Sequence, residues 1–211
     1  MRSARYAQRI LRSGKAFAPI VVPIESTPMT SYAIGGSAVR MYREIVSGAV
    51  LLVDVHNHEP TGYQCPFCFL LDGGETPLDG PRDIVLRTPL ATAFTASRWW
   101  PNNRGHVLVI PNAHHENLYD LPPEYGYAVH DVVREIAIAM RATYNCDGVS
   151  TRQHNEPDGG QDVWHYHVHV FPRYRDDNLY GSQPLPDMAT ADARWHYAER
   201  LRNHLESPTV T

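Results

Sequence analysis

The chain has 211 residues, of which 43% are hydrophobic and 20% are charged, and its formal net charge is −4. This length and composition suit one domain with a buried core plus extensions, and the negative charge excludes a protein that coats nucleic acid through bulk charge. The sequence has no run of about twenty apolar residues, so we expect no membrane span.

Residues 1–62 differ from the rest of the chain in charge and in proline content. They carry seven basic and four acidic residues, whereas residues 63–211 carry twelve and nineteen. Arginines recur every three or four positions from Arg2 to Arg12, a pattern that also suits a targeting helix. Prolines break any longer element soon afterwards. We therefore expect residues 1–62 to form an N-terminal extension that is in part flexible.

From Tyr63 onward the sequence alternates β-like and helical patterns. Short runs rich in β-branched and aromatic residues, separated by turn residues, predict antiparallel strands. Two segments with apolar residues every three or four positions predict amphipathic helices. We expect a domain over residues 63–182 and a C-terminal helix and tail over 183–211. The predicted strands cover residues 84–87, 91–95, 105–111, 149–154 and 163–171, and the predicted helices run from after Pro123 to near Asp147-Gly148 and from Ala191 to His204.

The cations of the chain exclude several classes of site. There is one lysine, Lys15, beside eighteen arginines. A phosphate-binding P-loop has the pattern GxxxxGK[ST]. Gly14 precedes Lys15, but the first glycine of the pattern is missing and Ala16 stands in place of the hydroxyl residue. The lysine motif of protein kinases is absent too, as are GxSxG and GxGxxG. A serine hydrolase or a dinucleotide-binding fold therefore has no local support.

Histidine is the unusual residue of this chain. Eight of the twelve histidines lie between His106 and His169, and three of them alternate in the segment His-Tyr-His-Val-His-Val-Phe at 165–171. Alternate side chains of a strand point to one face, so the three imidazoles would share a face and Tyr166 would pack on the other. Because imidazole titrates near neutral pH, such a row suits metal binding, or one ring that acts as nucleophile beside neighbours that orient it.

Several motifs within residues 63–175 resemble the histidine triad (HIT) superfamily in the right order. The segment from Gln161 through the three histidines to Pro172-Arg173 is similar to the family signature, and residues 105–114 are similar to its G-H-x-L-V-I-P-x-x-H segment. An asparagine ahead of a glycine-rich loop and a CxxC pair, found in the zinc-carrying bacterial-type branch, complete the resemblance. It implies an α+β fold with a five-stranded antiparallel sheet and a long helix, arranged as a homodimer that binds nucleotides.

The resemblance also implies a reaction and a role for individual residues. HIT proteins hydrolyse or transfer nucleoside monophosphates from phosphoramidates, dinucleoside polyphosphates or adenylylated compounds. His167 would attack the α-phosphate and form a nucleotidyl-histidine, and His169 would donate to the phosphate or to the leaving group. Asn155, Gly160 and Gln161 would hold phosphate oxygens. The alternative is a zinc-stabilised, nucleotide-binding regulatory or scaffold protein that turns over poorly.

The chemistry of imidazole agrees with these roles. A displacement at phosphorus that proceeds in two steps needs a nucleophile that is largely neutral near pH 7 and is also a good leaving group. Charge on the phosphoryl oxygens must meet preorganised donors, which the exposed N–H groups of a glycine-rich loop provide. Such a site needs neither a lysine nor an essential Mg²⁺.

The CxxC pair at Cys65 and Cys68 suggests a metal or a redox couple. Three cysteines, an odd number, fit a reducing compartment, and we expect the cytoplasm. Tetrahedral zinc needs two more ligands, and the resemblance supplies His114 and His165 for a structural zinc. A catalytic zinc on the three alternating histidines is disfavoured because such neighbours lie about 6.6 Å apart along a strand. Other candidate ligands are His56, His58 and His115.

Overall fold

The computed structural model describes residues 57–207 and four short strands before them, in a chain that divides into two compact units, Met1–Asp54 and Val55–Thr211. In the first unit β1 (Tyr32–Ile34) pairs antiparallel with β2 (Ser37–Val39), and β3 (Ile45–Val46) pairs antiparallel with β4 (Ala49–Val50). The arginine repeat at residues 2–12 lies outside the described residues.

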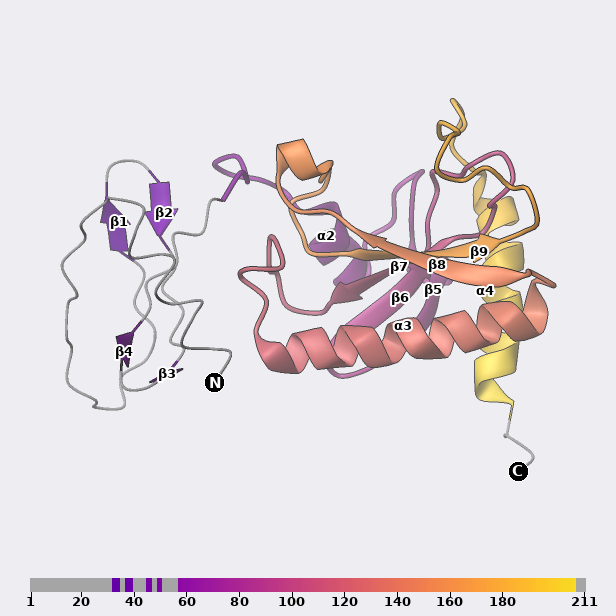
Figure 1. Cartoon of the computed structure of the whole chain (residues 1–211), viewed down its shortest axis with the longest axis horizontal. Coiled ribbons are helices and arrows are strands. Elements are labelled where there is room, and N and C mark those ends of the chain that lie inside the picture. Colours follow the sequence, from indigo (N-terminus) through magenta and orange to yellow (C-terminus); the bar gives the residue numbers. More distant parts are fainter. Residues whose placement is uncertain (1–31, 35–36, 40–44, 47–48, 51–56, 208–211) are drawn as a thin grey trace, which may run out of the picture. The chain divides into compact units, whose positions relative to one another are not determined.

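A five-stranded antiparallel sheet forms the centre of the second unit (Figure 1). Its spatial order is β5-β6-β7-β9-β8, so the last strand in sequence lies between two earlier ones. The expected α+β fold is confirmed. The strands are β5 (Ile84–Arg87), β6 (Ala91–Thr95), β7 (Val107–Pro111), β8 (Gly148–Gln153) and β9 (Val168–Arg173).

Alternate residues of the sheet pack into two cores. On one face Val107 and Val109 pack with the apolar stripe of α3 (Pro123–Thr143), the long helix that runs along the sheet in Figure 1. On the other face Leu108 and Ile110 pack with α2 (Pro66–Leu71). His169 pairs in register with Leu108, so its side chain lies on the α2 face. No helix in the described part of the chain is both long and apolar enough to cross a membrane.

The predicted strand over residues 163–171 was wrong in its start. It begins at Val168, because the backbone N–H of His165 donates to the carbonyl of Val163, and that of Tyr166 donates to the carbonyl of His115. Those two N–H groups therefore make no ladder bonds to β7 or β8. The strand predicted from residue 105 begins at Val107.

Helix α2 was not predicted at all. Its six residues are too few to show a helical period. The sequence does carry a start signal, since Cys65 accepts a hydrogen bond from the N–H of Cys68 and Pro66 occupies the first turn.

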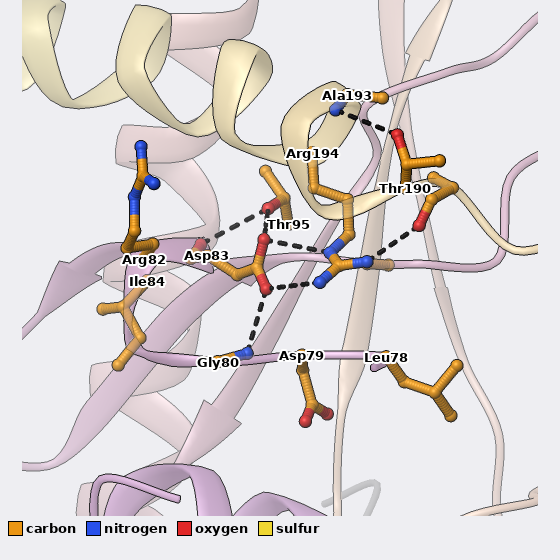
Figure 2. A network of polar contacts seen from close by, with 12 residues as sticks. Leu78, Asp79, Gly80, Arg82, Asp83, Ile84, Thr95, Thr190, Ala193 and Arg194 are labelled. Atoms are coloured by element: carbon orange, nitrogen blue, oxygen red, sulfur yellow. Dashed lines mark hydrogen bonds and ion pairs between the residues drawn. The ribbon is translucent and has the colours of Figure 1, made fainter. Parts of the chain in front are cut away.

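A buried ion pair attaches the C-terminal helix α4 (Ala191–Glu206) to the sheet domain (Figure 2). Arg194 is 2% exposed, and its guanidinium bonds both carboxylate oxygens of Asp83, at 3.0 and 3.1 Å. Asp83 also accepts from the N–H of Gly80 and the hydroxyl of Thr95, and Arg194 donates to the carbonyl of Ala189. This network satisfies both buried charges and holds the segment that leads into α4.

We predict that Arg194→Met lowers the free energy of unfolding by about 3–5 kcal/mol, because it leaves the Asp83 carboxylate buried without its partner. Urea denaturation measures this loss. Glu199→Gln is the control on the same helix, since it removes only an exposed 3.6 Å pair with Arg82 and should cost less than about 1 kcal/mol. Equal losses in the two variants would contradict the role of the buried pair.

Candidate functional site

One cluster brings together the four residues that the resemblance implies for zinc: Cys65, Cys68, His114 and His165. One ligand atom from each lies within 4.8 Å of the others. Sγ of Cys65 is 3.3 Å from Nδ1 of His165, and Sγ of Cys68 is 3.3 Å from Nδ1 of His114. Four ligands placed tetrahedrally around zinc are separated by about 3.3–3.8 Å. The spacing of the cluster therefore fits a four-coordinate metal.

Hydrogen bonds made by Nε2 orient the rings of His114 and His165 so that Nδ1 of each faces the cluster. Nε2 of His165 donates to the carbonyl oxygen of Pro111 at 3.0 Å, and Nε2 of His114 donates to a carboxylate oxygen of Glu59 at 2.7 Å. With the proton of a neutral imidazole on Nε2, each Nδ1 would offer its lone pair to a metal. Such outer bonds are typical of histidines that hold metals.

The two thiols of the cluster also differ in acidity. Burial opposes ionisation of Cys65, but contacts with His114 and His165 lower its pKa to about 5. Burial and the neighbouring Cys65 raise the pKa of Cys68 to about 12. The charge of one ionised thiol therefore opposes ionisation of the other. A divalent metal would allow both to ionise.

The middle histidine, His167, is 1% exposed and lines a cavity of about 380 Å³. Its Nδ1 lies 2.7 Å from the carbonyl oxygen of His165. A carbonyl oxygen only accepts, so Nδ1 must carry the proton. Burial lowers the pKa of the ring, which is therefore neutral at pH 7, and its Nε2 keeps a lone pair. The tautomer of His167 is thus set by the residue that also belongs to the cysteine cluster.

His169 and His106 form a second pair of rings in the same cavity. Nδ1 of His169 lies 3.4 Å from Nε2 of His106, whose own Nδ1 is buried without a partner. The His106 ring is 1% exposed and stacks on Phe171 at 4.5 Å. Burial, helped by the positive charge of Arg152, lowers the pKa of His106 to about 3. Burial also places the pKa of His169 well below its usual value, so both rings are neutral near pH 7.

Asn155, Gly160 and Gln161 belong to the loop between β8 and β9, which contains the short 3-10 helix η2 (Pro157–Gly159). Gly160 lines the cavity and has a φ of 86°. The side chain of Gln161 donates to the carbonyls of Glu116 and Val163 and accepts from the N–H of Glu156. The oxygen of Asn155 accepts from the N–H of Leu118. In this conformation Gly160 therefore borders the cavity, and the two amides hold the loop.

The walls of the cavity differ in polarity on the two sides of β9. On the side of β7 and β6 the lining is apolar and includes Phe94 and Leu108. Pro184 and Met188, from the segment before α4, also line the cavity. On the side of β8 the lining is polar and includes Arg152 and His154. The cavity thus has a mainly apolar wall, with Arg98 after β6, and a polar, basic wall on the opposite side of the triad.

Sequence patterns missed the residues that act across strands. Glu59 bonds His114, and Arg152 pairs in register with His169, each from a separate segment that no local motif links to its partner. His106 lies in the motif at residues 105–114, but its contact with His169 was not predicted. The pairing of Arg152 with His169 depends on the register of β8 against β9. That register places residue 152 on the face of the triad, and a correct alignment of the two predicted strands would have found it.

The chain is similar to known proteins over this domain. Residues 78–176 match the family model named HIT domain. Protein hit of Bacillus subtilis (strain 168) is 38% identical over 79 residues, 37% of this chain and 54% of that protein. An adenylylsulfatase of Arabidopsis thaliana is 29% identical over 121 residues, 57% of this chain and 58% of the relative. The chain thus spans little more than half the length of these two relatives.

A solved structure provides a comparison of the fold. The crystal structure of a Zn-bound histidine triad family protein from Mycobacterium smegmatis superposes with a TM-score of 0.55 at 28% identity. The superposition covers 67% of this chain and 93% of that one.

Pro184 and Met188 lie beyond residues 78–176, which match the family model.

We predict that His106→Asn makes the protein less sensitive to acid. The folded state keeps His106 neutral down to about pH 3, whereas the unfolded chain binds a proton there below about pH 6.5. Acid therefore favours the unfolded wild type, by about 2–3 kcal/mol between pH 7 and 4.5 from this residue. Denaturation at the two pH values should show a loss smaller by about that amount in the variant. Equal losses would contradict the assignment.

Proposed function

The chain belongs to the HIT domain family, and we propose that it is a nucleotide hydrolase or nucleotidyltransferase that reacts through a nucleotidyl-histidine on His167. The observation that carries this proposal is the buried, neutral ring of His167, bonded through Nδ1 to the carbonyl oxygen of His165. Nε2 is then a lone-pair donor in a ring that lines the cavity. A neutral imidazole with a free nitrogen is a competent nucleophile toward phosphorus.

In the first step Nε2 of His167 attacks the α-phosphorus of the substrate. An N–P bond forms, the bond from phosphorus to the leaving group breaks, and its electron pair stays with the leaving group. His169, whose ring centroid is 5.0 Å from that of His167, is neutral and donates a hydrogen bond there from its ring N–H, while an amine leaving group takes its proton from solvent. Water then attacks the phosphorus, the N–P electron pair returns to Nε2, and one proton is released. An alcohol or phosphate acceptor in place of water makes the reaction a transfer.

The loop after β8 is proposed to hold the phosphate oxygens through Asn155, Gly160 and Gln161. Gly160 suits this role because a Cβ there would meet Nδ1 of His154 at 3.4 Å and because its backbone is left-handed. Asn155 donates to a phosphate oxygen only by giving up the hydrogen bond from its Nδ2 to Oε1 of Gln153, and Gln161 only by giving up a bond from its Nε2 to a backbone carbonyl. The nucleoside would occupy the apolar pocket beside Phe94 and Leu108.

The cluster of Cys65, Cys68, His114 and His165 is proposed to hold one structural zinc ion. Its spacing and the outer bonds of both histidines support this, and so does the Zn-bound relative from Mycobacterium smegmatis. Bound zinc would supply two positive charges that balance the two thiolates. The protein's own contribution is to fix His165, whose carbonyl oxygen accepts a hydrogen bond from Nδ1 of His167.

We also propose that the protein is a cytoplasmic homodimer that accepts adenylyl compounds. The name of the Arabidopsis adenylylsulfatase supports the adenylyl group. Tyr127 and Ile138 on α3 are 73% and 44% exposed, which supports a partner on that helix. Free cysteines suit a reducing compartment.

We predict that His167→Ala lowers kcat for AMP release from adenosine 5′-phosphoramidate or diadenosine triphosphate by at least about 1000-fold, because it removes the nucleophile. Mass spectrometry of wild-type protein quenched in alkaline denaturant, in which the N–P bond is stable, should detect one nucleotidyl group, which His167→Ala lacks. The control His130→Asn changes an exposed histidine of α3 and should retain the wild-type rate. Wild-type protein that binds AMP but releases none from either substrate would favour the binding or scaffold alternative.

We predict about one zinc ion per chain in protein purified without chelators. Cys68→Ser removes a ligand and should leave much less zinc and lower Tm by roughly 5–15 °C. Cys146→Ser is the matched control, because this buried thiol donates to the carbonyl of Met140 and lies outside the cluster. It should keep the full zinc content in elemental analysis. Wild-type protein without zinc, or equal zinc in Cys68→Ser, would contradict the metal site.

A further inference from the structure

Arg152 on β8 is a cation of the cavity that the steps described above do not use. It pairs in register with His169 on β9, so the two side chains share a face of the sheet. Both residues line the same cavity. The charge of Arg152 is also among the causes, after burial, that lower the pKa of His106 and His169. Arg152 is therefore close to the group proposed to act on the leaving group.

The guanidinium of Arg152 is held in place without a carboxylate partner. Its Nη2 donates to the carbonyl oxygen of Leu179 at 3.3 Å, and its Nε is buried with no hydrogen-bond acceptor. Its central carbon lies 5.0 Å from the ring centroid of Phe171 and 4.8 Å from that of Tyr180. Within the described residues no ion pair involves Arg152, whereas Arg173 and Arg194 each bond an aspartate. Its charge is thus uncompensated and held by aromatic rings.

The other charges near the cavity indicate which side favours an anion. Asp162 also lines the cavity, and its negative charge favours a higher pKa of His167. The positive charge of Arg152 lowers the pKa of His106 and of His169. Arg98 and Asp79 line it as well. Negative charge that develops beside His169 therefore meets a cation, while an anion beside His167 also meets a carboxylate.

We propose that Arg152 binds the leaving group and selects substrates in which that group is itself a phosphate or sulfate anion. This inference rests on the proposed nucleotidyl transfer to His167. When the bond from the α-phosphorus to the bridging oxygen breaks, the electron pair stays on that oxygen, which belongs to the departing phosphate or sulfate. Arg152 stabilises the additional negative charge through its guanidinium hydrogens. An amine leaving group brings no such anion and gains nothing from Arg152.

The test compares two substrates with the same adenylyl group. Diadenosine triphosphate releases ADP as an anion, and adenosine 5′-phosphoramidate releases ammonia. Arg152→Met keeps an apolar side chain against Phe171 and removes the charge. We expect kcat/KM for diadenosine triphosphate to fall about 10- to 100-fold, the range expected for a charge-assisted hydrogen bond, and kcat/KM for the phosphoramidate to change less than about threefold. Arg152→Lys restores the charge but not the fork and should recover part of the loss.

Arg98→Gln removes the same charge from the same cavity and serves as the matched control. Because Arg98 follows β6, on the apolar side, this change should affect both substrates by the same factor. Equal losses on both substrates in Arg152→Met would overturn the proposal and indicate a structural role. No loss on diadenosine triphosphate would overturn it as well.

A binding measurement separates this proposal from the proposed catalysis. Inorganic pyrophosphate carries the charge of the leaving group without a nucleoside, and calorimetry measures its affinity without turnover. We expect Arg152→Met to weaken pyrophosphate binding at least tenfold, and unchanged affinity would overturn the assignment. If wild-type protein releases no AMP from either substrate while pyrophosphate binding still depends on Arg152, the catalytic proposal fails and the anion site stands.

Discussion

The hydrogen bond from Nδ1 of His167 to the carbonyl oxygen of His165 connects the two chemical centres of this protein. His165 is also one of four residues whose ligand atoms gather in the cysteine cluster. The bond sets the tautomer of His167, and burial keeps the ring neutral. A metal at the cluster would therefore act on the proposed reaction by holding one backbone carbonyl in place, not by contact with the proposed substrate.

The rest of the domain surrounds this bond with two different walls. The register of β7, β9 and β8 places Leu108, His169 and Arg152 side by side on one face of the sheet. A mainly apolar wall therefore lies on one side of the triad and a polar, basic one on the other. Outside the part matched by the family model, Pro184 and Met188 complete the apolar wall. The buried pair of Asp83 and Arg194 holds the segment that carries them.

The sequence predicted the strands and the two long helices well, because each has a local pattern, whereas His114 and His165 joined the CxxC pair only through the resemblance to the HIT family. Alternating apolar residues show strands, and His-x-His-x-His and CxxC are short motifs. Prediction from the sequence failed where a contact between residues far apart in the chain determines the structure. β9 begins late because Tyr166 bonds His115, and Asp83 meets Arg194 across 111 residues of chain. The partners of His106 and Arg152 depend on strand register. Asn155 and Gln161 bond Leu118 and Glu116, which lie far from them in the sequence, so no local pattern predicts these bonds.

Nitrogen-15 NMR of the ring of His167, in zinc-loaded full-length protein at pH 7, tests the central claim most directly. The two ring nitrogens have distinct shifts when one is protonated and the other is not, so the tautomer is read without any substrate. The account predicts a proton on Nδ1 and a free lone pair on Nε2. A proton on Nε2, or on both nitrogens, would contradict it, since His167 would then have no free nitrogen in the cavity with which to attack phosphorus.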